Sequence, residues 1–211
     1  MPSRKIADST VRRLAIYLRF LEEFQQKGAG TLSSEALAAR AGTTSAQVRK
    51  DLSFFGSFGK RGLGYDVRGL AEQLRTILGL TRRYRVILIG AGRLAGALVQ
   101  HAEFGARGFD IVAAVDRDPA KIGTGWGELL IADVAKLEKI VKQQNIEIAI
   151  LVTPADPAQG LVDRLVAAGV TAILNFAPVQ LHVPAGMDVK SVNLAVELET
   201  LSYAIQHRDS P

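Results

Sequence analysis

The sequence predicts an α/β protein of two domains, in which a winged helix precedes a doubly wound parallel sheet and a C-terminal helix. Before position 80, apolar side chains repeat at spacings of three and four, the period of amphipathic helices. From position 86 onward, continuous apolar runs alternate with helical segments, which is typical of parallel strands buried on both faces. We therefore expect a winged-helix domain over residues 1–79, a linker over 80–85, a doubly wound domain over 86–192 and a C-terminal helix over 193–211.

Helix signals begin close to the N-terminus. A first helix is expected over residues 9–27, where apolar residues line one face. Ser33 or Ser34 is suited to cap a second helix, which Gly42 closes. About three residues then separate the second helix from the next one, which is the arrangement of a helix-turn-helix.

A third helix is expected over residues 45–54. It opens with a capping box, in which Thr44 and Gln47 satisfy each other's free backbone amides. Residues 56–64 then hold four glycines in nine positions around a Lys60-Arg61 pair, a composition suited to a β-hairpin that needs positive φ angles. Three helices and a basic hairpin make a winged helix.

Positive charge is concentrated at positions 1–85, which hold 16 Lys and Arg against 7 Asp and Glu. The rest of the chain holds 10 against 14, so the N-terminal domain is the part suited to a polyanion. The second helix of a helix-turn-helix enters the major groove of double-stranded DNA, and a basic wing tip suits the minor groove. A solvated basic face is the alternative interpretation. The residues expected to contact DNA are Ser45, Gln47, Arg49 and Lys50 on the helix, and Lys60, Arg61 and Gly62 on the hairpin.

The second domain is expected to contain five strands and three intervening helices. The expected strands cover residues 86–89, 111–115, 148–152, 172–174 and 189–192, and the helices 94–104, 137–144 and 159–168.

A glycine-rich turn, Gly90-Ala-Gly92-Arg-Leu-Ala95, follows the first strand. Gly90 permits the tight turn, Gly92 lets the backbone approach a pyrophosphate, and Ala95 lets the helix pack closely on the sheet. The N-terminus of that helix faces the phosphate charge. A turn used only for packing is the alternative. The turn predicts a dinucleotide site that includes Gly90, Ala91, Gly92, Arg93, Leu94 and Ala95.

The next strand ends at Asp116, at the distance past Gly92 where the motif places an acid that accepts hydrogen bonds from ribose hydroxyls. A carboxylate repels a 2′-phosphate and so favours NAD(H) over NADP(H), whereas Arg117 beside it favours the phosphate. Two later turns lie at strand ends, where α/β sheets bind ligands. They are expected to form a nicotinamide pocket, with ordinary turn chemistry as the alternative, and contribute Thr153, Pro154, Asn175 and Phe176.

Several functional classes are excluded or disfavoured. The chain has no cysteine, which excludes a disulfide scaffold, a thiolate zinc site and a cysteine redox switch. Its three histidines belong to no acid–base or metal-ligating pattern, so we expect no catalytic residue, no enzyme and no metal. The chain has no apolar run long enough to span a membrane and the N-terminus lacks a signal-peptide pattern, so we expect a cytoplasmic protein that does not enter a membrane.

Four segments closely resemble the Rex family of redox-sensing transcriptional repressors. They are QVRKDLSFFG at residues 47–56, GKRGLGY at 59–65, the glycine turn at 90–95 and NFAP at 175–178. The resemblance extends over essentially the whole chain. It implies a homodimer with a Rossmann-like NAD(H)-binding domain and a C-terminal helix swapped between subunits. It also implies binding to operator DNA when the NADH/NAD⁺ ratio is low, and release when NADH binds.

By the same resemblance, Arg49, Lys50 and residues 60–62 are expected to touch DNA. The cofactor is expected against residues 90–95, Asp116, Thr153 and Phe176. The swapped helix agrees with the residues themselves, because a terminal helix with an apolar stripe needs a partner surface, and a symmetric dimer supplies one. The stripe consists of Leu194, Leu198, Leu201 and Ile205.

The sequence leaves some properties open. Some relatives carry a tyrosine and an aspartate–aromatic pair near the positions of His101, Asn193 and Leu194 here, so the redox set point and the sensitivity to NAD⁺ are not determined. The operator sequence is also open. Two other functions remain as alternatives: a repressor that senses another nucleotide, such as an acyl-CoA or ADP, and an NAD-dependent oxidoreductase with an accessory basic domain.

Overall fold

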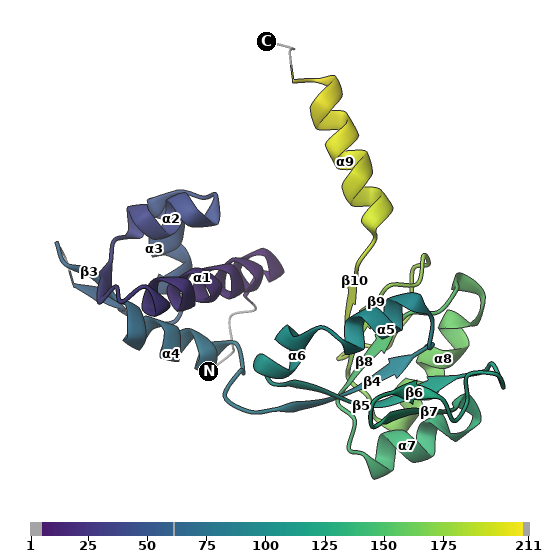
Figure 1. The fold of residues 1–211 in the computed structure, drawn as a ribbon. Helices are drawn as coiled ribbons and strands as arrows, with labels where there is room; N and C mark the ends of the chain where they lie inside the picture. Colours follow the sequence, from purple (N-terminus) through teal and green to yellow (C-terminus); the bar gives the residue numbers. More distant parts are fainter. Residues whose placement is uncertain (1–5, 61, 209–211) are drawn as a thin grey trace. The chain divides into compact units, whose positions relative to one another are not determined.

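The protein consists of two compact units and has the α/β architecture that the sequence predicts (Figure 1). The computed structural model describes residues 6–60 and 62–208. The first unit spans residues 1–82 and the second spans residues 83–211. Each unit has a hydrophobic core of its own.

In the N-terminal unit the helices pack on one another with their apolar faces turned inward, and a small sheet completes the unit. Its three strands form an antiparallel sheet in the order β1-β3-β2. The elements are α1 (Asp8–Gln26), β1 (Thr31–Leu32), α2 (Ser34–Ala41), α3 (Ser45–Ser53), β2 (Gly59–Lys60), β3 (Gly64–Asp66) and α4 (Val67–Ile77).

Strands β2 and β3 are the arms of the hairpin that the sequence predicts, and they form the wing. Gly64 has a φ angle of +82°, and a Cβ atom at this position would lie 2.5 Å from the carbonyl oxygen of Leu32. Both the backbone conformation and the approach of β3 to β1 therefore require glycine here.

The helix-turn-helix has the caps that the sequence predicts, with one exception. The Ser33 hydroxyl accepts a hydrogen bond from the N–H of Ala36 at 3.1 Å, and the Thr44 hydroxyl accepts one from the N–H of Gln47 at 3.1 Å. The reciprocal half of the capping box is wrong, because the Gln47 amide donates to Asp51 at 2.8 Å. An ionised carboxylate one turn along the helix is a stronger hydrogen-bond partner than a backbone amide.

Asp51 joins α3, the second helix of the helix-turn-helix, to α1 through a fully buried carboxylate. Arg13 donates to its two oxygens at 2.6 and 2.7 Å, and the Tyr17 hydroxyl donates at 2.9 Å. Burial alone would raise the pKa of Asp51, but hydrogen bonds from Arg13, Gln47 and Tyr17 hold it below the ordinary value. A bidentate, charge-assisted pair therefore determines how α3 lies on α1.

The second unit is a seven-stranded sheet in the order β10-β9-β8-β4-β5-β7-β6, and all neighbouring strands are parallel except β6 and β7. Its elements are β4 (Tyr84–Ile89), α5 (Arg93–Val99), α6 (Ala102–Ala106), β5 (Phe109–Asp116), β6 (Gly125–Trp126), β7 (Leu129–Asp133), the 3₁₀ turn η1 (Val134–Lys136), α7 (Leu137–Gln143), β8 (Ile148–Leu151), α8 (Ala155–Ala168), β9 (Ala172–Asn175), β10 (Asp188–Ser191) and α9 (Leu194–Gln206).

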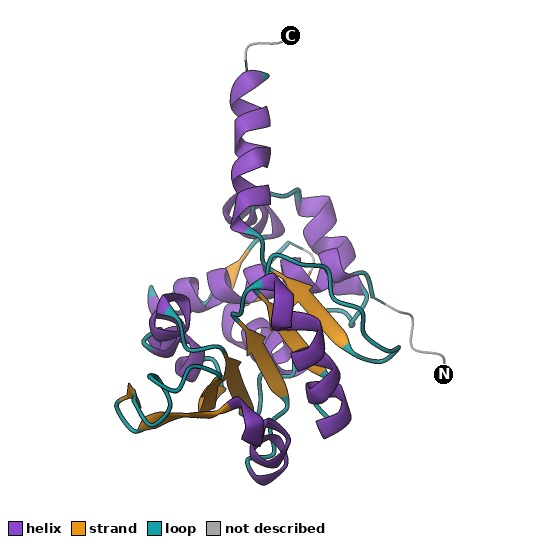
Figure 2. Ribbon diagram, turned by 90° about the vertical axis from the view of Figure 1, so that its right-hand side faces the viewer, coloured by secondary structure: helices purple, strands orange, loops and turns teal. Residues whose placement is uncertain are grey.

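Helices lie on both faces of this sheet, as expected for a doubly wound fold (Figures 1 and 2). Alternate residues of β4 enter two separate cores. Ile87 and Ile89 belong to the core on the side of α7 and α8, whereas Val86 and Leu88 belong to the core on the side of α5. The central strand is therefore buried on both sides.

The structure differs from the sequence expectations in several places, of which three bear on the arrangement of the sheet and its helices. Strand β4 begins at Tyr84, inside the expected linker 80–85, because its first residues pair with the start of β5. The helix expected over residues 94–104 is interrupted at His101, whose extended backbone separates α5 from α6. Strand β7, which pairs with the end of β5, is not predicted from the sequence.

Helix α9 continues the chain after β10 and has no buried residue (Figure 1). Its apolar stripe is 58–67% exposed at each of the four expected positions, Leu194, Leu198, Leu201 and Ile205. Neither α9 nor any other helix within the described residues is long and apolar enough to cross a membrane.

Replacing Asp51 with asparagine is expected to destabilise the N-terminal unit by about 3 kcal/mol, because it leaves Arg13 without its charged partner in a partly buried position. The effect should shrink in acid. The pKa of Asp51 is lower in the folded state, so this contribution is complete above the unfolded-state pKa and is lost as the pH falls through the folded-state value. Hydrogen exchange of the amides of α1 and α3 measures it. Glu72→Gln, which breaks the exposed pair of Glu72 with Arg68, is the matched control and should leave exchange unchanged.

Candidate functional site

The strand order of the second unit reverses next to β4. From β4 the chain goes through α5 and α6 to β5 on one side, and it later crosses to β8 on the other side. Connections that leave neighbouring strands in opposite directions open a crevice at the carboxyl ends of those strands, where open α/β sheets bind ligands. The glycine turn after β4, Val152-Thr153 after β8 and the segment after β5 meet at this crevice.

The glycine turn is shaped by two different requirements. Gly90 has a φ angle of +98°, and a Cβ atom there would lie 3.0 Å from the carbonyl oxygen of Val152. Gly92, the residue before α5, has no atom within 4 Å of a Cβ position. Gly90 is therefore required by the protein itself, whereas the space at Gly92 is open to a ligand, as the sequence analysis expects of a pyrophosphate site.

Asp116 anchors the turn to the end of β5. Its carboxylate accepts hydrogen bonds from the backbone N–H of Ala91 at 2.7 Å and of Asp118 at 2.9 Å, and from the Lys121 ammonium at 3.2 Å. Burial alone would raise the pKa of Asp116, but these donors hold it below the ordinary value. The acid is thus ionised and oriented, and its remaining lone pairs are the ones available to ribose hydroxyls.

A cavity of about 780 Å³ occupies the crevice. Seven of the residues predicted as cofactor contacts line it: Gly90, Ala91, Gly92, Asp116, Arg117, Thr153 and Pro154. Lys121 and Asp118, which are not among the site residues predicted from the sequence, also line it. The sequence carries a signal for Lys121, because a basic residue five positions after the motif acid can reach its carboxylate.

Thr153 carries an unsatisfied polar atom at this cavity. Its Oγ1 is buried and has no hydrogen-bond partner among the described residues. A buried hydroxyl without a partner is costly in a folded protein, and a ligand that supplies a hydrogen bond removes that cost. Together with the open space at Gly92, this orphaned hydroxyl fits a polar nucleotide ligand.

The other predicted cofactor residues lie around the cavity rather than on its wall. Arg93 lines a smaller adjoining cavity of about 500 Å³ with Trp126. Ala95 lies on the buried face of α5, and Leu94 of the same helix is 43% exposed. Phe176 is partly buried in the core on the α5 side of the sheet.

The side chain of Asn175 forms hydrogen bonds within the protein. Its side chain is fully buried, its amide donates to the carbonyl oxygen of Val179 at 3.1 Å, and its oxygen accepts from the N–H of Ala177 at 2.8 Å. The side chain therefore holds the turn that carries Phe176. A direct contact of Asn175 with a nucleotide stays a prediction.

In the N-terminal unit, α3 presents two of the expected DNA-contacting residues to solvent. Arg49 and Lys50 are exposed, whereas Ser45 and Gln47 are half-buried, and Gln47 is held by Asp51. On the wing, Lys60 ends β2 and Gly62 lies at the turn with a φ angle of +83°. The expected contact at Arg61 lies outside the described residues.

The three positions at which the sequence is expected to differ from some relatives lie in the second unit. His101 is exposed and lies at the start of α6, where its ring packs edge-on against Phe104 with a centroid distance of 5.1 Å. Asn193 caps α9 by accepting a hydrogen bond from the N–H of Ala195 at 3.0 Å. Leu194 begins the exposed stripe of α9.

Family comparisons agree with this division of the chain. The family described as "Putative DNA-binding protein N-terminus" matches residues 5–53, and the family described as "CoA binding domain" matches residues 81–179.

Curated relatives extend over nearly the whole chain. The redox-sensing transcriptional repressor Rex of Streptomyces coelicolor is 45% identical over 206 residues, which is 98% of this chain and 80% of the relative. That of Carboxydothermus hydrogenoformans is 46% identical over 206 residues, 98% of this chain and 99% of the relative. The chain belongs to the Rex family of redox-sensing transcriptional repressors. The family resemblance predicted from the sequence is thereby confirmed.

Solved structures of the Rex family have the same fold. The structure of RSP in complex with β-NAD⁺ and operator DNA is similar to this chain with a TM-score of 0.92 and 37% identity, and the match covers 97% of this chain and 94% of the other. The structure of RSP in complex with β-NADH has a TM-score of 0.89 and 36% identity, and that match covers 97% and 96%.

Gly90→Ala is expected to lower the stability of the second unit by about 2 kcal/mol, because alanine is strained at this φ angle and its Cβ would press on the backbone of Val152. Fluorescence of Trp126 during urea unfolding measures the change in this unit. The control is Gly160→Ala on the exposed side of α8, which meets nothing within 4 Å and should gain up to about 1 kcal/mol of helix propensity. Equal stability of the two variants would contradict the assignment of Gly90.

Proposed function

We propose that this chain is a cytoplasmic repressor that binds operator DNA when NADH is scarce and leaves it when NADH occupies the cavity beside Gly90. The observation that carries the proposal is a cavity at the strand switch point with an orphaned Thr153 hydroxyl, on a chain whose N-terminal unit exposes Arg49 and Lys50 on a recognition helix. Relatives that are redox-sensing repressors over nearly the full length support it.

In this proposal NAD(H) lies along the glycine turn. Asp116 is suited to hydrogen-bond the ribose diol, the N–H groups around Gly92 to meet the pyrophosphate, and Thr153 to bind near the nicotinamide side. The bound nicotinamide supplies the redox signal, since it is neutral when reduced and cationic when oxidised. The solved RSP complexes with β-NAD⁺ and with β-NADH support the choice of ligand.

We further propose that the working form is a homodimer in which α9 packs on the second subunit. The four-residue apolar stripe of α9 is exposed in the single chain. On the α5 side of the sheet, Ile148, Leu174 and Phe176 are only partly buried, and within the described residues no helix of this unit other than α5 and α6 packs on that side. An uncovered apolar helix and an uncovered apolar sheet face complement each other in a symmetric pair.

A dimer also explains how one signal reaches two DNA half-sites. Two recognition helices related by a two-fold axis read a palindromic operator. NADH shifts the dimer away from its DNA-binding conformation only to the extent that it binds the other conformation more tightly. A nearly complete switch needs a preference of about 10⁴-fold, which is about 5.5 kcal/mol.

A CoA derivative is the second candidate ligand, because the family described as "CoA binding domain" matches residues 81–179. We propose NAD(H) instead, since Asp116 is ionised and lies where the ribose hydroxyls of a dinucleotide are expected. The chain also has features of a sensor rather than an oxidoreductase. No histidine or tyrosine among the described residues lines the cavity, and its Asp116 and Lys121 are paired with each other.

In a titration at constant salt, NADH is expected to release the protein from its operator, while NAD⁺ at the same concentration leaves it bound. Salt is held constant because phosphate contacts make DNA affinity steeply salt-dependent. Fluorescence anisotropy of labelled operator DNA measures release, and energy transfer from Trp126 to NADH measures ligand binding. Unchanged operator affinity at saturating NADH would refute the proposal. Release by a CoA ester but not by NADH would favour the second candidate, and steady consumption of NADH with a carbonyl substrate would favour an enzyme.

Asp116→Asn is expected to weaken NADH binding at least tenfold, because the charged acceptor is lost, and to leave the protein bound to its operator at NADH concentrations that release the wild type. Asp133→Asn is the matched control. Asp133 pairs in register with Asp116 at the end of the neighbouring strand but does not line the cavity. Equal NADH affinity of the two variants would contradict the role of Asp116.

Leu201→Glu is expected to convert the dimer into monomers, because it places a charge in the centre of the apolar stripe. Thr200→Glu adds the same charge one position away, off the stripe, and should leave the dimer intact. Sedimentation velocity measures the mass of each variant. A Leu201→Glu protein that remains a dimer would place the interface elsewhere.

A further inference from the structure

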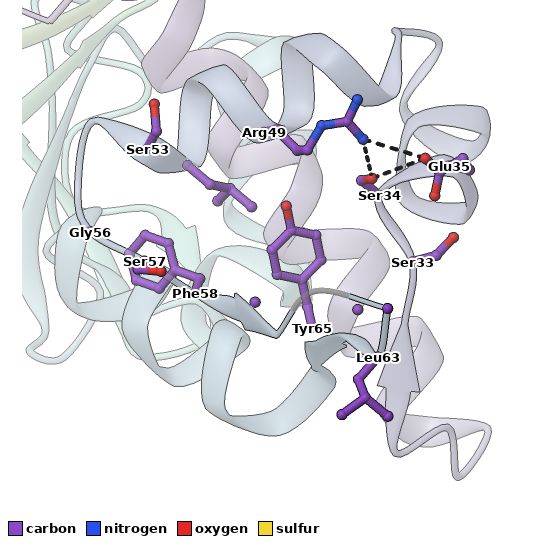
Figure 3. A pocket seen from close by; sticks show the side chains of 14 residues that line it. Ser33, Ser34, Glu35, Arg49, Ser53, Gly56, Ser57, Phe58, Leu63 and Tyr65 are labelled. Carbon is purple, nitrogen blue, oxygen red and sulfur yellow. Dashed lines mark hydrogen bonds and ion pairs between the residues drawn. The ribbon is translucent and has the colours of Figure 1, made fainter.

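Another cavity, of about 680 Å³, lies in the N-terminal unit between the start of α2, the recognition helix α3 and the wing (Figure 3). Hydroxyl groups and one guanidinium dominate the part of its lining near α2, which includes Ser34, Arg49 and Tyr65. The opposite part is formed by the end of α3, which includes Ser53, and by the segment between α3 and β2, which includes Phe58. The function proposed above does not use this cavity.

Tyr65 contributes a donor with no partner. The residue is only 7% exposed, and its hydroxyl points into the cavity toward the side of Arg49 and Ser34 (Figure 3). Among the described residues, this hydroxyl makes no hydrogen bond. Burial raises the pKa of Tyr65, so the phenol keeps its proton at neutral pH and can donate it. The side chain is therefore ready for an acceptor that the protein itself does not supply.

Arg49 is held on the same side by α2. Its Nη1 donates to the Ser34 hydroxyl at 2.7 Å and lies 3.4 Å from a carboxylate oxygen of Glu35. The Arg49 side chain is still 55% exposed, and a guanidinium has five N–H donors, so most of them remain available. Glu35 is also exposed, and such pairs contribute little and exchange readily for a better anion.

The position of the cavity indicates which anion fits. A winged helix places its recognition helix in the major groove and a basic wing in the minor groove, and the sugar–phosphate backbone runs between the two grooves. The cavity lies between α3 and the β2–β3 wing, and it opens to solvent. An acceptor-only group that meets a guanidinium and a phenol at this position is a backbone phosphate.

We infer that this cavity seats one phosphodiester of the DNA backbone, with Arg49 and the Tyr65 hydroxyl as its donors, and that Glu35 holds Arg49 until the phosphate replaces it. The inference rests on the proposed operator binding and names the residues that position the backbone between the two grooves. Tyr65 and Glu35 carry no sequence information in this role, because phosphate contacts fix register and orientation rather than base identity.

Tyr65→Phe removes only the donor. Operator affinity is expected to fall about tenfold, and affinity for a scrambled duplex by the same factor, because a hydrogen bond to a charged group is lost. Stability should not fall, since the hydroxyl has no partner inside the described part of the protein. Ser53→Ala is the matched control: Ser53 lines the same cavity, but its hydroxyl already donates to the carbonyl oxygen of Lys50 at 2.7 Å. This variant should bind DNA like the wild type.

Glu35→Gln tests the exchange of anions on Arg49. Removal of the competing carboxylate is expected to raise the affinity for both duplexes about threefold. A fall in affinity would show that Glu35 supports the DNA-binding conformation instead, and would overturn its role as the displaced anion.

Operators that carry a single methylphosphonate, scanned along the backbone, locate the phosphate. At one position per half-site, removal of the charge should weaken wild-type binding but should not weaken binding by Tyr65→Phe any further. Additive losses at every position overturn the inference. Wild-type protein that does not bind the unmodified operator refutes the proposed function instead, so the two failures are distinct.

A further experiment tests whether the cavity binds free inorganic phosphate instead of DNA. Inorganic phosphate is exchanged for chloride at equal ionic strength, and wild-type operator affinity should not change. Competition by millimolar phosphate that disappears in Tyr65→Phe would mean that the cavity binds free phosphate rather than DNA, and would overturn the inference.

Discussion

A parallel sheet needs apolar cover on both of its faces, and this chain covers one face more completely than the other. Helices α7 and α8 cover one side of the seven-stranded sheet, and the side chains of Ile87 and Ile89 are buried beneath them. On the other side, α5 and α6 lie over the part next to β4 and β5. On that side Ile148 of β8 and Leu174 of β9 remain partly buried, and α9 remains exposed. The fold that opens the ligand crevice beside β4 thus also leaves apolar surface on this face and on α9, which the proposed homodimer would bury.

Two buried carboxylates connect this architecture to function in the same way. Asp51 draws donors from α1 and α3 and determines how the recognition helix lies, while Asp116 draws donors from the glycine turn and the segment after β5 and determines how the crevice is shaped. In both cases burial raises the pKa of the carboxyl group, but several hydrogen bonds lower it by more, so the group is charged. A segment held by a single charged centre adopts one geometry, which suits a site that must present donors at defined positions.

The sequence predicted the elements whose signals are local. Caps at Ser33 and Thr44, the hairpin glycines and the strand before Gly90 follow from backbone chemistry within a few residues, and the structure confirms them. Strand β7 was missed because it is a short apolar run whose pairing with β5 depends on a distant segment. The single helix expected over residues 94–104 divides at His101, where an otherwise helical pattern gives no local signal for a break.

The same distinction applies to the sites. By itself the sequence determined the residue types and their order: a basic third helix, a basic wing, a glycine turn, and an acid at the end of the strand that follows it. Only the tertiary structure decided which polar side chains already have hydrogen-bond partners within the protein and which do not. Gln47 is bound by Asp51 and Asn175 by its own turn, while the hydroxyls of Thr153 and Tyr65 have no hydrogen-bond partner among the described residues. Hydrogen-bond partners from distant parts of the chain determine this, because a polar side chain can bind a ligand only through donors and acceptors that are not already paired within the folded protein.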